Sequence, residues 1–145
     1  MITVYIVNHN YERYLLQSIN SVLDQTLQDF ELIIIDNGST DGSQKLIEKF
    51  SPHEKVLTIF QENLGLNTAN NIALGRANGR YLIRLDADDF LDLHALQVLS
   101  STLDRHPDIG LVFPDFYLTD ATGQVLKTVR RQDISKASLL DLPPH

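Results

Sequence analysis

Acidic residues gather at two places where apolar runs of the sequence end. Asp36 directly follows the run ELIII, and Asp86, Asp88 and Asp89 (the DADD motif) directly follow the run YLIRL. Carboxylates that converge on one site repel one another and raise one another's pKa unless a cation binds there. Oxygen ligands with few protein donors suit Mg²⁺ or Mn²⁺, with water and substrate phosphate completing the coordination. The pattern therefore predicts a divalent cation at DADD. Because Asp86 and Asp88 are two residues apart, an extended chain would place them on the same side.

Two structural interpretations of these acidic segments stay open. Asp88, Asp89 or Asp92 could cap the helix that follows and complement its dipole. The segment DNGSTDGS, which begins at Asp36, could be an ordinary turn that opens a helix, with Ser39 or Thr40 as its cap.

Other phosphate and metal motifs are excluded by spacing. A calcium loop counted from Asp86 fails, because Phe90 stands at a ligand position and Leu91 at the required glycine. The glycines Gly38 and Gly42 form neither a GxGxxG dinucleotide motif nor a P-loop.

Alternating apolar runs and helical patterns position these residues. The runs predict strands over Ile2 to Val7, Glu31 to Ile35, Val56 to Phe60, Tyr81 to Leu85 and Ile109 to Phe113. Helices are expected after Asn10 as N-cap, over Asp41 to Phe50, over Leu66 to Ala77, and over Leu93 to Leu103 with Asp92 as cap. This order predicts an α/β fold, a doubly wound, mostly parallel sheet with helices on both faces, which binds ligands at the carboxyl ends of its strands. Near the C-terminus, Phe116 to Leu118 and Val125 to Val129 predict a β-hairpin.

Composition limits the class of protein. The chain has 145 residues, 43% of them apolar, which suits one domain over residues 1–145. It has no cysteine, so disulfides and thiolate metal sites are excluded, and its net charge of -7 argues against nucleic-acid partners. No apolar run approaches the roughly 20 residues of a transmembrane helix, and no cleavable leader precedes the first strand. We expect a cytoplasmic protein, with peripheral association at the inner face of the membrane left open.

Four segments carry a family resemblance. They are VYIVNHNYERYL from Val4, DNGSTDGS from Asp36, NLGLNTANNIAL from Asn63 and GRYLIRLDADDFL from Gly79. In this order and spacing they resemble the family 2 glycosyltransferases of the GT-A (Rossmann-like) fold, over about residues 2 to 120. The resemblance implies an inverting enzyme that moves a sugar from a nucleotide-diphosphate donor to an acceptor hydroxyl with help from Mg or Mn. A UDP-sugar is the expected donor and a saccharide, lipid-linked or protein acceptor the expected partner, in polysaccharide or cell-wall biosynthesis.

The resemblance also assigns site residues. Asn8 and His9 would hold the nucleotide base, Asp36 would accept a hydrogen bond from it, and Asn70 would join the nucleotide site. Asp86 would lie near the ribose and diphosphate, and Asp88 would bind the metal, with Asp89 as an outer carboxylate.

Two departures from the family pattern matter. Asn70-Asn71 stands where many relatives have an arginine before the asparagine, which puts the identity of the nucleotide in doubt. No residue matches the family's catalytic base; Asp115, Asp120 and Asp133 occupy no matching motif. We therefore expect a nucleotide-sugar-binding domain, truncated before the acceptor-binding region and inactive by itself. The alternative is a non-catalytic nucleotide-binding or docking module.

Overall fold

The computed structural model describes residues 1–121 and 123–130. The chain falls into two compact units, Met1–Arg105 and His106–His145, which are described separately. Asp133 lies outside the described residues.

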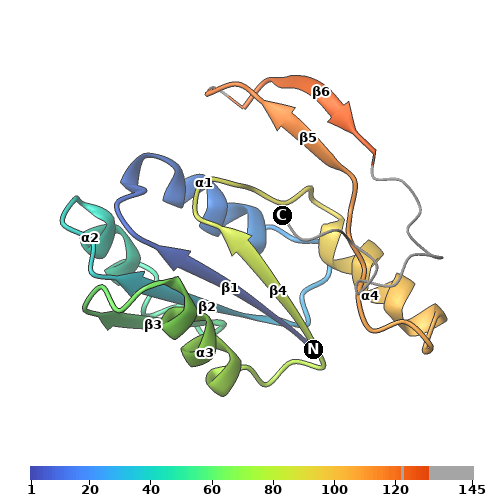
Figure 1. Ribbon diagram of the computed structural model, residues 1–145, viewed down its shortest axis with the longest axis horizontal. Coiled ribbons are helices and arrows are strands. Elements are labelled where there is room, and N and C mark those ends of the chain that lie inside the picture. Colours follow the sequence, from blue (N-terminus) through green and yellow to red (C-terminus); the bar gives the residue numbers. More distant parts are fainter. Residues whose placement is uncertain (122, 131–145) are drawn as a thin grey trace, which may run out of the picture. The chain divides into compact units, whose positions relative to one another are not determined.

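The first unit is a four-stranded parallel sheet in the order β3-β2-β1-β4 (Figure 1). Its elements in chain order are β1 (Ile2–Asn8), α1 (Glu12–Leu23), β2 (Phe30–Asn37), α2 (Ser43–Glu48), β3 (Val56–Gln61), α3 (Leu66–Arg76), β4 (Tyr81–Asp86) and α4 (Ala95–Arg105). This confirms the doubly wound α/β fold and the first four predicted strands. Two residues at most separate the predicted and observed bounds of those strands.

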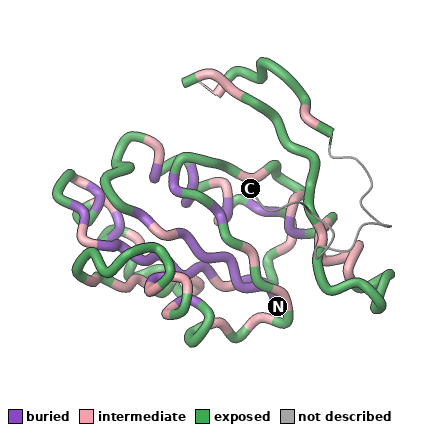
Figure 2. The backbone as a smooth tube through the Cα atoms, viewed as in Figure 1, coloured by how far each residue is buried: buried purple, intermediate pink, exposed green. Residues whose placement is uncertain are grey.

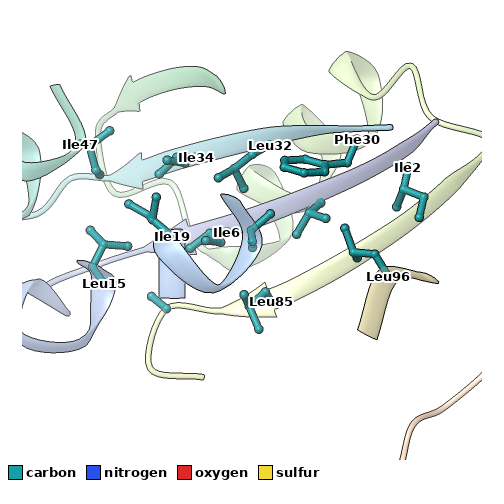
Figure 3. Packing of buried hydrophobic residues seen from close by; sticks show 13 residues of the cluster. Ile2, Ile6, Leu15, Ile19, Phe30, Leu32, Ile34, Ile47, Leu85 and Leu96 are labelled. Carbon is teal, nitrogen blue, oxygen red and sulfur yellow. The ribbon is translucent and has the colours of Figure 1, made fainter. Parts of the chain in front are cut away.

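Helices cover both faces of the sheet. On one face, α1 contributes Leu15, Ile19 and Val22, and α2 and α4 contribute Ile47 and Leu96 to a cluster with the even-numbered residues of β1 and β2. Figure 3 shows Ile19 of α1 over Ile6 and Ile34 of the sheet. On the other face, Ala69 and Ala73 of α3 pack on Tyr5, Ile33 and Ile35. The small side chains of α3 let it approach the sheet closely.

The two central strands hold half of the buried residues in the described part of the chain (Figure 2). All seven residues of β1 except Val7, and all eight of β2 except Glu31, are buried. Full burial of an isoleucine or leucine side chain stabilises the fold by roughly 1.5–3 kcal/mol. These strands are therefore the rigid support on which the ends of the sheet are held.

The second unit contains the predicted hairpin, β5 (Phe116–Thr119) paired antiparallel with β6 (Val125–Val129). The predicted strand Ile109 to Phe113 is wrong: the segment has no strand structure. Ile109, Leu111 and Phe113 are 40%, 58% and 47% exposed. Within the described residues this apolar run has no neighbouring strand to pair with, and its composition alone cannot form a ladder.

Two predicted helix caps are also wrong. Asn10 has a left-handed φ of 63°, and α1 begins two residues later, at Glu12. The Asn10 side-chain oxygen instead accepts hydrogen bonds from the backbone N–H groups of Thr40 (2.7 Å) and Asp41 (3.3 Å). Helix α2 begins at Ser43, too late for Ser39 or Thr40 to cap it. The side chains of Asn10, Ser39 and Thr40 therefore join the loop after β1 to the loop after β2 and do not cap a helix.

Helix α4 begins at Ala95, two residues later than predicted, so Asp92 does not cap it directly; its Oδ1 accepts the backbone N–H of His94 at 3.0 Å in the turn before the helix. No helix in the described ranges is long and apolar enough to cross a membrane.

Candidate functional site

The carboxyl ends of the parallel strands meet at one edge of the sheet and carry the polar residues singled out in the sequence. In the strand register Asn8 lies opposite Asp36, and Val7 lies opposite Asp86. Because successive side chains alternate between faces, Asp36 leaves the sheet on the face of Asn8, and Asp86 leaves it on the face of Val7. The edge therefore presents the two acidic sites on opposite faces.

Asp36 is a buried acceptor that organises the loop after β2. Its Oδ1 accepts Nδ2 of Asn8 at 3.0 Å, and its Oδ2 accepts the backbone N–H of Ser39 at 3.0 Å and Nε2 of Gln44 at 3.1 Å. The residue has no exposed surface. A buried carboxylate is tolerated when it is hydrogen-bonded in this way. Three of the carboxylate's roughly four lone-pair sites thus accept hydrogen bonds from the protein itself.

Asn8 is fully buried beside Asp36. Its Nδ2 also donates to Oγ of Ser39 at 2.9 Å, which ties the end of β1 to the loop. Its Oδ1 is buried and has no hydrogen-bond partner among the described residues. An unpaired buried acceptor costs free energy, so this oxygen is available to a donor that enters the site.

His9 is exposed, and its ring is hydrogen-bonded to the backbone. Its Nδ1 lies 2.9 Å from the backbone carbonyl oxygen of Asn37, so this nitrogen must donate. Its Nε2 lies 3.4 Å from Nδ2 of Asn10 and from Nδ2 of Asn63, at the long limit of a hydrogen bond. The proton that faces the Asn37 carbonyl is therefore on Nδ1.

Asn37 is a site residue that the sequence analysis missed. Its side chain faces the α3 side of the sheet, accepts Nε2 of Gln61 at 2.7 Å and the Leu64 N–H at 3.2 Å, and donates to Oδ1 of Asn63 at 3.1 Å. The alternation of side chains along β2 could have identified Asn37 from the sequence. Asn37 lies two residues after Ile35 and therefore on the same face as Ile33, Ile35 and Asp86. Gly38 makes this network possible, because a Cβ there would lie 2.6 Å from the Asn63 backbone nitrogen.

Asp86 ends β4 and is exposed. Both Nε and Nη2 of Arg84 donate to its Oδ1, at 2.9 Å and 2.5 Å. Tyr5 lies across from Arg84 in the strand register and is buried. Burial raises the pKa of the Tyr5 hydroxyl, the charge of Arg84 lowers it and that of Asp86 raises it. The three residues therefore share one face at the end of the sheet.

Asp88 and Asp89 lie in a turn. The Asp89 N–H donates to the Asp86 carbonyl oxygen at 3.0 Å, so the expectation of an extended chain from Asp86 to Asp88 is wrong. Burial raises the pKa of the Asp89 carboxyl, and the carboxylates of Asp88 and Asp86 raise it further. No group of three metal-binding side chains occurs in residues 1–121 and 123–130. The crowded oxygens nevertheless fit a hard divalent cation, which would relieve their repulsion.

Asn70, in the second turn of α3, is half-buried. Its Oδ1 is buried without a hydrogen-bond partner in the described part of the chain. The structure thus gives the position of every predicted site residue.

The comparisons with known proteins agree on one family. The model for Glycosyl transferase family 2 matches residues 3–137. An uncharacterized glycosyltransferase of Nostoc sp. is 40% identical over 113 residues, 77% of this chain and 35% of the relative. Chondroitin synthase of Escherichia coli is 30% identical over 127 residues, 87% of this chain and 18% of the relative. The chain thus spans about a third or less of the length of these two relatives.

Solved structures show the same fold. The structure of residues 1–349 of TarS from S. aureus in complex with UDP is 25% identical, with a TM-score of 0.67, over 73% of this chain and 32% of that one. A complex of the same protein with UDP-GlcNAc matches with the same TM-score of 0.67. Together with the family model, which matches nearly the whole sequence, these likenesses show that the chain belongs to glycosyl transferase family 2.

Proposed function

We propose that the chain binds a nucleotide-diphosphate sugar at the carboxyl edge of its sheet and presents the sugar to an acceptor hydroxyl. The observation that carries this proposal is the meeting of β1, β2 and β4 at that edge, with His9, Asn37 and the acidic turn after Asp86 on it. The similar TarS structures hold UDP and UDP-GlcNAc, which favours a UDP-sugar as donor.

The base is proposed to lie beside His9. The exposed imidazole of His9 offers a flat surface to a nucleobase, and its hydrogen bond to the Asn37 carbonyl holds the ring in place. Asn8 contributes through its unpaired buried Oδ1. Asp36 acts by holding Asn8 and the loop at Ser39 in position. Asn70, with an unpaired oxygen on α3, is proposed to complete the nucleotide site.

The diphosphate is proposed to lie beside the acidic turn. Asp88 would hold a Mg²⁺ or Mn²⁺ ion, and Asp86 would lie near the ribose and diphosphate. When bound, such a cation neutralises charge on the phosphates as the bond to the sugar breaks. Burial first, and then the charges of Asp88 and Asp86, raise the pKa of the Asp89 carboxyl, and a bound cation would compensate these neighbouring carboxylates.

Transfer is proposed to invert the anomeric carbon, because the acceptor hydroxyl attacks from the face opposite the departing diphosphate. The acceptor is proposed to be a saccharide, a lipid-linked sugar or a protein, in cell-wall or polysaccharide synthesis at the cytoplasmic face of the membrane. We assign no catalytic base in this chain and propose that these residues alone bind the donor without turning it over. The alternative, a docking module without a nucleotide, stays the competing hypothesis.

Calorimetric titration of the chain with UDP, GDP, dTDP and CDP, each with and without Mn²⁺, tests the proposal. We expect UDP to bind most tightly and Mn²⁺ to strengthen its binding. Binding of none of the four nucleotides would contradict the donor site and favour the docking module. Transfer of sugar by the 145 residues alone would show that a base lies among them.

A further inference from the structure

The ion pair between Arg84 and Asp86 has no evident structural purpose. The two side chains are 39% and 53% exposed. Ion pairs with this exposure contribute little to stability, because solvent screens them. Both residues lie on the same face of β4, two positions apart, where the strand itself brings them together.

The geometry of the pair is asymmetric. Nε and Nη2 of Arg84 both donate to Oδ1 of Asp86, at 2.9 Å and 2.5 Å. Among the described residues, nothing donates to Oδ2 of Asp86. A carboxylate held by one oxygen keeps the lone pairs of the other for a further donor, such as a hydroxyl group.

The part of β4 that carries Arg84 and Asp86 is held on both faces of the sheet. Tyr5, the register partner of Arg84, is 7% exposed and packs with Ala69 and Ala73 of α3. The Asp86 backbone is held from the other face, where Ser18 of α1 donates to its carbonyl oxygen at 3.3 Å. Arg84 therefore acts on a carboxylate whose main chain is already fixed, and what it adds is the direction of the carboxylate oxygens.

The distribution of charge at the end of β4 also supports a role for Arg84 in orienting Asp86. Asp86, Asp88 and Asp89 crowd one turn, and of the ion pairs in the described ranges only that of Arg84 involves this turn. Asn70 on the helix of this face carries no charge. The Arg84 guanidinium thus offsets one of the three carboxylates, that of Asp86.

We propose that Arg84 is a positioning residue for donor binding, which holds Asp86 by Oδ1 and directs Oδ2 to a ribose hydroxyl of the nucleotide. The inference rests on the proposed function. It predicts that Arg84 acts through Asp86 and not by separate contact with the ligand.

A double-mutant cycle on UDP affinity, measured by calorimetry in the presence of Mn²⁺, tests this proposal. We expect Arg84→Gln and Asp86→Asn each to weaken UDP binding about tenfold, and the double variant to bind no more weakly than Asp86→Asn alone. Arg84→Lys, which can still donate to Oδ1, should recover part of the loss. Arg80→Gln is the matched control, because Arg80 pairs with Asp104 at the start of the same strand, and it should leave the affinity unchanged.

Three results would overturn the inference. Additive losses in the double variant would show that Arg84 contacts the ligand by itself. Unchanged affinity in Arg84→Gln, or in Asp86→Asn, would show that the pair has no part in binding, while the donor site itself would stand. Failure of the unsubstituted chain to bind UDP would contradict the proposed function and the inference together. Melting temperatures of all variants separate these effects from loss of folding.

Discussion

Asp36 and Asp86 lie near the carboxyl ends of the two strands that flank β1, and their side chains leave the sheet on opposite faces. Asp36 lies in register with Asn8 and is buried with three donors, whereas Asp86 lies in register with Val7, is exposed and pairs with Arg84. We therefore propose different roles for the two carboxylates: Asp36 holds a loop in place, and Asp86 contacts a ligand through the oxygen that Arg84 does not hold.

Replacement of Asp36 should lower the free energy of unfolding. Asp36→Ala leaves the Asn8 amide, the Ser39 N–H and the Gln44 amide without their acceptor. We expect the free energy of unfolding to fall by about 2–4 kcal/mol, as measured by urea denaturation. Asp24→Ala, at an exposed position after α1, should change it by less than about 0.5 kcal/mol. Equal effects of the two substitutions would show that the Asp36 network does not stabilise the loop.

Replacement of Asp88 should remove the metal-dependent part of nucleotide binding. Asp88→Asn keeps the shape of the side chain but weakens an oxygen ligand in the acidic turn. We expect the gain in UDP affinity on addition of Mn²⁺ to fall at least about tenfold. Calorimetry with and without Mn²⁺ measures this gain, and Asp104→Asn, an exposed carboxylate beside Arg80, should retain it. The metal assignment fails if both variants keep the same response to Mn²⁺.

Two glycine substitutions should change stability in opposite directions. Gly38 has a φ of 74°, and a Cβ there would lie 2.6 Å from the Asn63 backbone nitrogen. We expect Gly38→Ala to destabilise the chain by about 1–3 kcal/mol through left-handed strain and displacement of this contact. Gly75, in α3, has nothing within 4 Å of the added Cβ, and Gly75→Ala should stabilise by up to about 1 kcal/mol. Thermal unfolding measures both; a stabilising Gly38→Ala would contradict the close approach of the two loops.

Stability should depend on pH through Glu31. Desolvation works to raise the pKa of this carboxyl, but hydrogen bonds from Thr3, Asn78 and Gly79 outweigh it and lower the pKa below its ordinary value of 4.5. A lowered pKa in the folded state contributes stability above the unfolded value, and this contribution is lost as the pH falls through the folded value.

Glu31→Gln tests that dependence. We expect it to cost about 1–2 kcal/mol at neutral pH and progressively less as the pH falls below 4.5. Urea denaturation at several pH values measures the difference. Glu48→Gln, at an exposed position of α2, is the control and should show no such pH dependence. A difference between Glu31→Gln and the unsubstituted chain that stays constant down to acid pH would contradict the role of these hydrogen bonds.

The sequence predicts the sheet well, because β1 and β2 are buried on both faces and their apolar runs have no other stable arrangement. Ile109 to Phe113 has the same composition, but a strand also needs a neighbour, which composition does not reveal. The sequence wrongly predicts Asn10 and Ser39 as helix caps. A polar side chain that hydrogen-bonds its own helix cannot be distinguished in sequence from one that hydrogen-bonds a distant loop.

The positions of the acidic residues along the strands can be predicted from the sequence, but the faces on which their side chains lie cannot. Strand ends are readable from apolar runs, so Asp36 and Asp86 could be placed at one edge. Their faces depend on the register with β1, which places Asn37, not Asp36, on the side of Asp86. The turn at Asp88 arises from backbone geometry that spacing does not fix, whereas Arg84 and Asp86 share a face because they are two residues apart in β4.

The most direct test of the donor site is a residue-resolved NMR titration of the chain with UDP and Mg²⁺. The account predicts that the amide signals that shift are those of His9, Asn37 and Asp86 to Asp89, at the carboxyl edge of the sheet. The signals of Asp29, Asn78 and Arg80, near the opposite ends of the strands, should stay in place. Shifts confined to those opposite ends, or no shifts at saturating UDP, would contradict a donor site at the carboxyl edge.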